Sequence, residues 1–315
     1  MANESDITKV WISPSASYAI YGNVNDTKEY SEDIPTQVMK AQKNENEING
    51  MREGNLQDAV AVIEWLHWME GAVVESNGDI EKLSELSADA KVLEFREKQP
   101  DFVMRSFGSI SAFGENAAVI HYSSTPETNV AITDQNVYML DSGGQYRCGT
   151  TTDTTRTMHY GTPADRHKEA YTRVLQGVID LSRSIFPHGR TGRDVDTHAR
   201  QQLWNNGWDF NHGTGHGLGA MLNVHEVLYA CNALPAPLPD EYNHGISRHR
   251  AKRTSSVTTV RDCSNPYNPY LPPTATDTTA RINDLRKKMR EIERRNIIAY
   301  IIPSEDSHDV SMVYI

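Results

Sequence analysis

The sequence contains little cysteine. Its 315 residues include Cys148, Cys231 and Cys263, which lie far apart and form no Cys-X-X-Cys pair. An odd, widely spaced set of this kind argues against a disulfide framework and against a zinc site built from cysteines. Free thiols are typical of a reducing compartment, so we expect a cytoplasmic protein.

Long apolar runs and a surplus of positive charge are also missing. No run of about 18 apolar residues occurs, which is the length that a transmembrane helix needs, and Met1 to Val10 is too polar for a secretory signal. The 42 Asp and Glu residues outnumber the 31 Lys and Arg residues, which gives a net charge of −11. We therefore expect no membrane partner and no nucleic-acid partner.

Apolar residues recur at helical spacing in several segments. The longest runs from Asn44 to Val74, although Gly50 and Gly54 weaken its first turns. Another helix follows Thr162, which can cap it, with Pro163 in the first turn. The predicted helices cover residues 44–74, 87–99, 163–185 and 195–204.

Short β-branched and aromatic runs lie between Phe102 and Thr157, and they predict a largely buried sheet. The predicted strands cover residues 119–122, 137–140 and 149–157. Because helices precede and follow these strands, the predicted fold class is α+β. Residues 230–275 are rich in proline and lack any sustained period, so we expect a disordered linker there. A predicted helix and strand follow, and they are too short to bury a core of their own.

Two aspartates could act together if the sheet brings them to one side. Asp141 ends the predicted strand 137–140, and Asp153 lies in the threonine-rich strand 149–157. Oxygen ligands of this kind suit a hard divalent cation. Taken singly, an aspartate at a strand end is more often a turn former, and a histidine on an apolar strand is more often a hydrogen-bonded core residue.

Histidines lie in three further places. His212 and His216 are four residues apart, which matches a helical zinc motif, but Gly213 and Gly215 argue against a helix. We therefore expect a strand or turn to carry these two rings. His121 and His225 each flank or end an apolar run.

Several motifs occur in one order along the chain. They are Trp11-Ile-Ser-Pro-Ser-Ala-Ser-Tyr18, Ile120-His-Tyr122 with Pro126-Glu-Thr-Asn129, Leu140-Asp-Ser-Gly-Gly-Gln-Tyr146, Thr155-Arg-Thr-Met-His-Tyr-Gly-Thr-Pro163, and His212-Gly-Thr-Gly-His-Gly through Asn223-Val-His-Glu226. From about Trp11 to Glu226 the chain resembles aminopeptidase P, the Xaa-Pro aminopeptidase branch of the metallopeptidases that includes methionine aminopeptidase, prolidase and creatinase.

The resemblance implies a pita-bread catalytic domain with two divalent metal ions, typically manganese (Mn²⁺). By position, Asp141 and Asp153 would be the aspartate ligands and His216 the histidine ligand. The catalytic histidines would be His121, His212 and His225, with the first two on the substrate side and His225 bonding the substrate or moving protons. The substrates implied are peptides with an Xaa-Pro N-terminus, from which the first residue is released. We also consider a homodimer.

The chain departs from the family pattern at two glutamate ligands. The Asp-Glu-Pro-Gly and Ile-Glu-Asn motifs that would carry them are absent, and Glu241 beside Asp240 lacks the following Pro-Gly. We therefore expect an incomplete pita-bread domain whose metal site and aminopeptidase activity are impaired. The alternative is a non-catalytic pita-bread module that binds a peptide or protein, and a third reading is an unstable fold with an exposed sheet edge.

The segment Gly149-Thr-Thr-Thr-Asp153 holds one threonine more than the family pattern. The additional residue either turns the following side chains to the other face or is absorbed as a bulge. In the first case Asp153 would point away from Asp141. Cys148 also stands where the family usually has an acidic residue.

Residues 276–308 resemble the beginning of aminopeptidase P, although here they follow the catalytic segment. The chain is thus expected to be truncated and rearranged. The predicted domains are the tail of a preceding middle domain at 1–35, a partial pita-bread domain at 36–229, the Pro-rich linker at 230–275, and a fragment resembling the family's N-terminal domain at 276–315.

Overall fold

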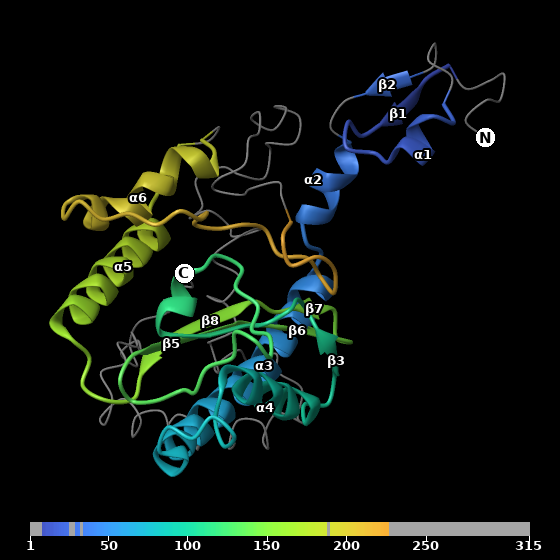
Figure 1. The fold of residues 1–315 in the computed structure, drawn as a ribbon. Helices are drawn as coiled ribbons and strands as arrows, with labels where there is room; N and C mark the ends of the chain where they lie inside the picture. Colours follow the sequence, from blue (N-terminus) through green and yellow to red (C-terminus); the bar gives the residue numbers. More distant parts are fainter. Residues whose placement is uncertain (1–7, 25–28, 32–33, 188–189, 227–315) are drawn as a thin grey trace. The chain divides into compact units, whose positions relative to one another are not determined.

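The computed structural model describes residues 8–24, 29–31, 34–187 and 190–226 (Figure 1). The chain divides into two compact units after Lys43. The predicted linker and C-terminal fragment lie outside the described residues, as do Cys231, Cys263 and Glu241. The domain boundaries predicted from the sequence therefore stay predictions.

The first unit consists of short elements. It contains β1 (Val10–Ile12), α1 (Tyr18–Tyr21), β2 (Glu29–Ser31) and α2 (Pro35–Ala41). Strands β1 and β2 pair in parallel with Trp11 opposite Tyr30, and the two rings meet edge to face at 5.4 Å. The aromatic pair stabilises this two-stranded contact.

The second unit begins with two capped helices, α3 (Glu45–Ser76) and α4 (Glu85–Glu97). The Asn44 side chain accepts a hydrogen bond from the Glu47 N–H at 3.0 Å, and the Glu47 carboxylate accepts one from the Asn44 N–H at 2.9 Å. Such a reciprocal pair satisfies two backbone donors that a helix start leaves free. The predicted helices 44–74 and 87–99 are confirmed.

Gly50 and Gly54 are needed for the packing of α3. A Cβ atom on Gly50 would lie 1.8 Å from the Cys148 carbonyl oxygen, and one on Gly54 would lie 2.3 Å from Thr150 Oγ1. The Thr150 hydroxyl also donates to the Gly50 carbonyl oxygen at 2.5 Å. The helix therefore meets strand β7 (Thr150–Thr151) at backbone distance, which only glycine permits.

Six short antiparallel strands form two three-stranded sheets. One has the order β3 (Phe102–Arg105), β6 (Gly144–Tyr146), β7, and the other has the order β4 (Ile110–Phe113), β5 (Val137–Ser142), β8 (Thr154–His159). The chain passes from the second sheet to the first through Gly143 and returns through Thr152 and Asp153. A Cβ atom on Gly143 would lie 1.9 Å from the Thr152 carbonyl oxygen, so the two crossing segments lie in direct backbone contact.

Two of the three predicted strands are confirmed. The strand 137–140 extends to Ser142 as β5, and the strand 149–157 is present as β7 and β8 with an interruption at Thr152 and Asp153. The predicted strand 119–122 is wrong. It follows a 3-10 turn (Gly114–Ala118), and Val119 and Ile120 are 54% and 48% exposed, so this apolar run does not face a core.

The main core lies between the two helices and the β4-β5-β8 sheet, and Figure 1 shows α3 and α4 lying together along these strands. Trp65 is fully buried and its indole N–H donates to the Ala88 carbonyl oxygen at 3.0 Å. The buried cluster contains Val62, Trp65, Leu66, Met69, Val73, Leu83, Ala88, Val92, Ile132, Tyr138, Leu140 and Met158. Helices on one face of an antiparallel sheet confirm the α+β class.

Two further helices, α5 (Asp165–Arg183) and α6 (Gly192–Trp204), pack against each other. At their contact a Cβ atom on Gly177 would lie 2.0 Å from the Ala199 carbonyl oxygen. The predicted helices 163–185 and 195–204 are confirmed, but the expected cap is wrong. Helix α5 follows Ala164, which makes no side-chain cap, and α6 begins three residues earlier than predicted because Thr191 and Asp194 form a capping box.

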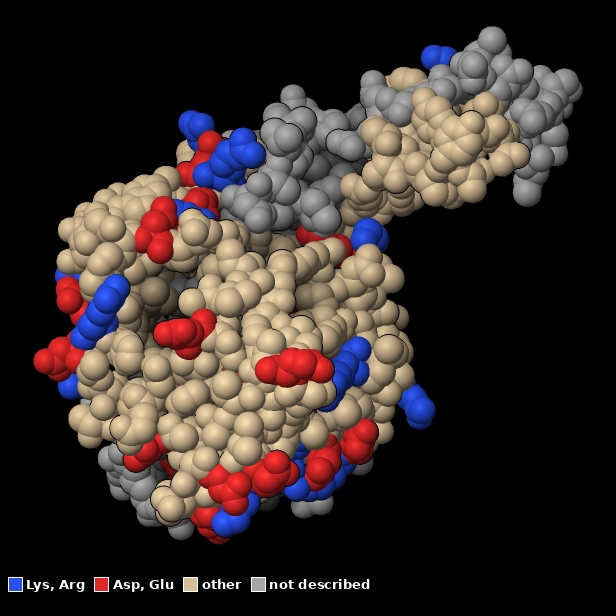
Figure 2. All heavy atoms as spheres, in the orientation of Figure 1, with Lys and Arg blue, Asp and Glu red and all other residues tan. Residues whose placement is uncertain are grey.

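The surface carries charges of both signs. Figure 2 shows acidic and basic side chains interspersed on the face in view. Among the helices of the described residues, none combines the length and the apolar character that crossing a membrane requires.

Candidate functional site

The two aspartates meet where the chain crosses between the sheets. Asp141 lies near the end of β5, paired in register with Thr155 of β8, and Asp153 immediately precedes β8. Burial, the neighbouring charge of Asp153 and a hydrogen bond with that residue raise the pKa of Asp141 to about 7, against the lowering effect of a bond to Thr155. One of the Asp141 carboxyl oxygens, Oδ1, is buried and has no hydrogen-bond partner within the described part of the chain. This oxygen is available to a ligand.

The additional threonine does not turn Asp153 away from Asp141. Strand β7 ends at Thr151 and β8 starts at Thr154, so the irregularity falls in the crossing segment and leaves both ladders in register. Thr152 is held there because its hydroxyl accepts a hydrogen bond from the Gly144 N–H at 2.8 Å. Of the two outcomes expected from the sequence, the structure therefore shows the second, in which the additional residue is absorbed between the two strands.

His216 contacts Asp153 directly. Its Nε2 lies 3.0 Å from Asp153 Oδ2, and its Nδ1 lies 2.8 Å from the Gly217 carbonyl oxygen. Burial lowers the pKa of His216, but the hydrogen bonds to Asp153 and Gly217 and the charges of Asp153 and Asp141 outweigh it, so that the net shift is upward. A backbone carbonyl on Nδ1 also directs Nε2 toward the carboxylate, which is the arrangement found behind metal-binding histidines.

A tight backbone pairing brings His225 to the same place. Gly217 and Glu226 exchange two backbone hydrogen bonds of 2.9 and 2.7 Å, and a Cβ atom on Gly217 would lie 2.5 Å from the Glu226 carbonyl oxygen. As a result the rings of His216 and His225 lie 4.2 Å apart at 60°. Burial and the charges of His216 and His121 lower the pKa of His225, and Asp153 opposes them.

His121 reaches this group from a different loop. Its backbone is left-handed, with φ of +54°, and its charge is one of those that lower the pKa of His225. The next residue, Tyr122, is buried and donates a hydrogen bond to Glu85 Oε2 at 2.8 Å. The loop is therefore attached to the first turn of α4. No local sequence pattern predicts this contact, because Glu85 and Tyr122 lie 37 positions apart.

His212 is placed differently. Its ring packs on Phe210 at 4.5 Å, and its Nδ1 lies 2.8 Å from the Gly213 carbonyl oxygen. No hydrogen bond, ion pair or ring contact joins it to the other five predicted site residues within the part of the chain that the structure describes. As expected from Gly213 and Gly215, no helix carries His212 and His216.

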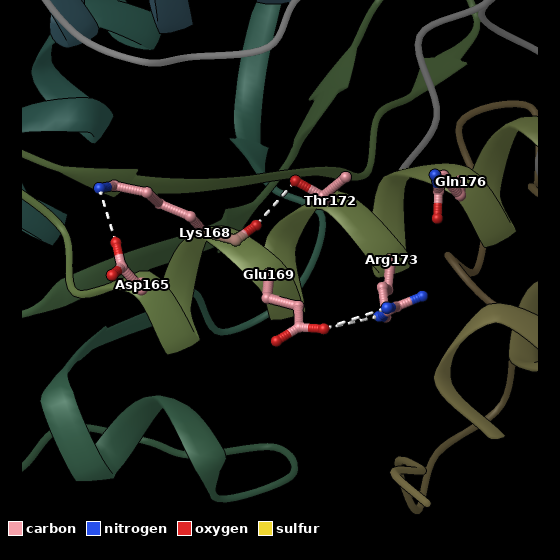
Figure 3. Close-up of a pocket in the computed structure, with 6 residues that line it drawn as sticks. All are labelled: Asp165, Lys168, Glu169, Thr172, Arg173 and Gln176. Carbon is pink, nitrogen blue, oxygen red and sulfur yellow. Dashed lines mark hydrogen bonds and ion pairs between the residues drawn. The ribbon is translucent and has the colours of Figure 1, made fainter. Parts of the chain in front are cut away.

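A pocket of about 380 Å³ lies elsewhere, along one face of α5 (Figure 3). Lys168 pairs with Asp165 at 3.1 Å and Arg173 pairs with Glu169 at 3.0 Å, so its charged groups neutralise each other. None of its lining residues is a predicted site residue; they are Asp165, Lys168, Glu169, Thr172, Arg173 and Gln176.

The donor set at the sheet crossing suits a divalent cation in its chemistry. Asp141, Asp153 and His216 offer two carboxylates and one imidazole, and Asp141 Oδ1 lacks a partner. The placement is not that of a loaded site: among the described residues no group of three or more His, Cys, Asp or Glu side chains is arranged around a metal position. His216 and Asp153 are instead bonded to each other, and a metal would take the place of the proton between them.

Comparison with known proteins identifies the family. The family model for metallopeptidase family M24 matches residues 49–252, which is more than half of the chain. The chain belongs to metallopeptidase family M24. The match continues past Glu226 to residue 252.

Relatives in this family carry closely similar sequences. Xaa-Pro aminopeptidase 1 from Dictyostelium discoideum is 45% identical over 234 residues, which cover 73% of this chain and 37% of that protein. Probable Xaa-Pro aminopeptidase P from Metarhizium acridum is 49% identical over 192 residues, which cover 61% of this chain and 30% of that protein. The chain thus spans about a third of the length of these curated relatives.

Solved M24 structures are similar in fold. The X-prolyl aminopeptidase of Caenorhabditis elegans, described as a cytosolic enzyme with a di-nuclear active site, aligns with a TM-score of 0.67 at 37% identity and covers 72% of this chain and 36% of that one. The Xaa-Pro dipeptidase of Bacillus anthracis aligns with a TM-score of 0.58 at 26% identity, covering 73% and 62%. These similarities confirm the predicted pita-bread fold, of which this chain contains a part.

Proposed function

We propose that this M24 chain carries part of the site of a metal-dependent aminopeptidase that releases the N-terminal residue of peptides with proline in second position. The observation that carries the proposal is the meeting of Asp141, Asp153 and His216 at the sheet crossing, with a buried carboxyl oxygen of Asp141 left without a partner. The names of the Dictyostelium and Metarhizium relatives support the substrate class.

In this proposal Asp141, Asp153 and His216 hold two divalent ions, with manganese as the expected metal. The di-nuclear site described for the Caenorhabditis elegans enzyme supports the number of ions. Bound divalent ions would polarise the scissile carbonyl and activate a water molecule for attack. The chain prepares the ligands in advance, because the Gly217 carbonyl accepts from His216 Nδ1 and leaves Nε2 for the metal.

The remaining histidines act on the substrate. Burial lowers the pKa of His225 and so favours its neutral ring, which can accept a proton and pass it to the proline nitrogen as the peptide bond breaks. His121 and His212 bind the peptide. An Xaa-Pro bond has no N–H, so a site that recognises it must not depend on that donor.

We further propose that this chain turns over peptides weakly. The two glutamate motifs of the family pattern are absent from its sequence, which leaves fewer oxygen ligands for a pair of ions. A cytoplasmic location and a homodimer belong to the proposal as well. The scarcity of cysteine and the cytosolic description of the Caenorhabditis elegans enzyme support the location.

The test is hydrolysis of Xaa-Pro-Xaa peptides by the full chain with added manganese, together with metal analysis. We expect slow release of the first residue that His225→Ala abolishes and that His198→Ala, an exposed histidine on α6, leaves unchanged. Fast turnover that depends on His225 would contradict the proposed impairment and would support the proposed aminopeptidase activity. Absence of both metal and hydrolysis, with measurable peptide binding, would instead support the non-catalytic binding module.

A further inference from the structure

Arg200 on α6 binds the loop segment 209–212, which leads to the candidate site. Its side chain is 12% exposed. The Nη1 group donates to the Phe210 carbonyl oxygen at 2.6 Å and to Asp209 Oδ1 at 2.9 Å, and the Nη2 group donates to the His212 carbonyl oxygen at 2.7 Å. One guanidinium therefore binds three residues of the segment 209–212, namely Asp209, Phe210 and His212.

Asp196 holds this guanidinium from one turn earlier on α6. Its carboxylate accepts from Arg200 Nε at 2.7 Å and also from the Thr214 hydroxyl at 2.5 Å. The guanidinium carbon of Arg200 lies 4.2 Å from the centre of the Phe210 ring, and that ring packs on His212 at 4.5 Å. Backbone and side chain of His212 are thus both fixed through Arg200. The four-residue spacing of Asp196 and Arg200 is typical of ion pairs within a helix.

A fixed anchor is needed here because the chain is rich in glycine. Gly213, Gly215, Gly217 and Gly219 alternate with other residues, and glycine loses more conformational freedom on ordering than any other residue. A planar guanidinium can direct hydrogen bonds to several acceptors at once, whereas a lysine ammonium cannot reproduce that pattern.

The second half of the loop has a separate anchor. His216 is bonded to Asp153, and Gly217 pairs with Glu226 through two backbone hydrogen bonds. Loss of Arg200 should therefore release His212 and leave His216 in place.

We propose that Arg200 is a positioning residue that sets the place of His212 for peptide binding, without contacting the peptide. The inference rests on the proposed function, in which His212 is a peptide-binding histidine. Helix α6 thereby holds the first half of the glycine-rich loop in place.

The test compares Arg200→Lys with Arg173→Lys in the full chain. Arg173 is the matched control because its guanidinium pairs with Glu169 one turn earlier on α5, as Figure 3 shows. The imidazole signals of His212 and His216 are followed by NMR, and the affinity for an Ala-Pro-Ala peptide is measured by calorimetry in the presence of manganese. We expect Arg200→Lys to shift the His212 signal, because the Phe210 ring lies 4.5 Å from the His212 ring and affects its chemical shift. The His216 signal should stay unchanged. Peptide affinity should fall about tenfold, in keeping with the loss of hydrogen bonds to a charged group, while Arg173→Lys changes neither.

Three results would overturn the inference: an unmoved His212 signal, unchanged peptide affinity in folded Arg200→Lys, or His212 and His216 signals that move together with a general loss of stability. If the unmodified chain binds no peptide, the proposed function fails and so does the binding role of Arg200, whereas the NMR signals still decide whether Arg200 places His212. Should Arg200→Lys fail to fold, Asp196→Asn weakens the hold on the Arg200 guanidinium and should give the same shift at smaller size.

Discussion

His216 Nε2 lies 3.0 Å from Asp153 Oδ2, and this contact joins a glycine-rich loop to the crossing of two sheets across 63 positions of sequence. The two groups share a proton in this arrangement. As metal ligands both must be free of it, because metals bind neutral imidazole and ionised carboxylate. Protons and metal ions therefore compete for the same pair of atoms.

Metal affinity should rise with pH. The pKa values of Asp141 and His216 are both raised, so more protons must leave these groups before a metal can bind at acidic or neutral pH. We expect the manganese affinity, measured by calorimetry, to increase between about pH 6 and pH 8. Asp153→Asn and His216→Ala should abolish binding, whereas the exposed His198→Ala should bind as the unmodified chain does. An affinity independent of pH would argue against Asp141 and His216 as ligands.

Without metal, the stability of the chain should fall as the pH rises between about 4 and about 7. The pKa of Asp141 is about 7 in the folded protein, compared with an ordinary value of 3.8, so in this range the unfolded chain has lost a proton that the folded chain keeps. The stabilising contribution of protonated Asp141 is complete below its ordinary pKa of 3.8 and is lost as the pH rises past its folded-state pKa of about 7. Asp141→Asn should flatten this part of the profile, as measured by urea unfolding in the presence of a chelator. A profile that is the same in both proteins would show that Asp141 is not the cause.

Two glycines of α3 should respond to alanine with opposite signs. At Gly50 a Cβ atom would lie 1.8 Å from the Cys148 carbonyl oxygen, so Gly50→Ala must push α3 away from the turn before β7 and should cost more than about 2 kcal/mol of unfolding free energy. At Gly71 a Cβ atom meets nothing within 4 Å, and Gly71→Ala should stabilise the helix by about 0.5–1 kcal/mol. Urea unfolding measures both, and equal effects at the two positions would contradict the packing of α3 on β7.

Glu85 should be important for stability. It is fully buried and accepts hydrogen bonds from the Phe113 N–H at 2.6 Å, the Tyr122 hydroxyl at 2.8 Å and the Asn116 amide at 3.0 Å. Glu85→Gln places a donor among these donors and should cost about 1–3 kcal/mol. The control is Glu94→Gln, which removes an exposed pair with Lys91 and should change stability by less than about 0.5 kcal/mol. A small effect at Glu85 would mean that water or rearrangement satisfies its partners.

The elements with a strong local pattern could be predicted well. The apolar spacing of 44–74 indicated α3, and the β-branched run 137–140 indicated β5, because each pattern reports burial of one side of one element. The strand predicted at 119–122 is wrong because the same kind of pattern was taken as a sign of burial. Its apolar side chains suggested a buried strand, but Val119 and Ile120 are exposed, and exposure depends on what other segments cover.

Residue type and spacing along the chain were enough to indicate the family, the order of the motifs and the candidate residues. That Asp153 faces Asp141 could be seen only in the folded chain, because the additional threonine is absorbed at the crossing where Gly143 and Thr152 lie in contact. It also decided that Arg200 holds the loop of His212. Such contacts join segments whose separation in sequence carries no periodic signal, so they follow from packing rather than from local pattern.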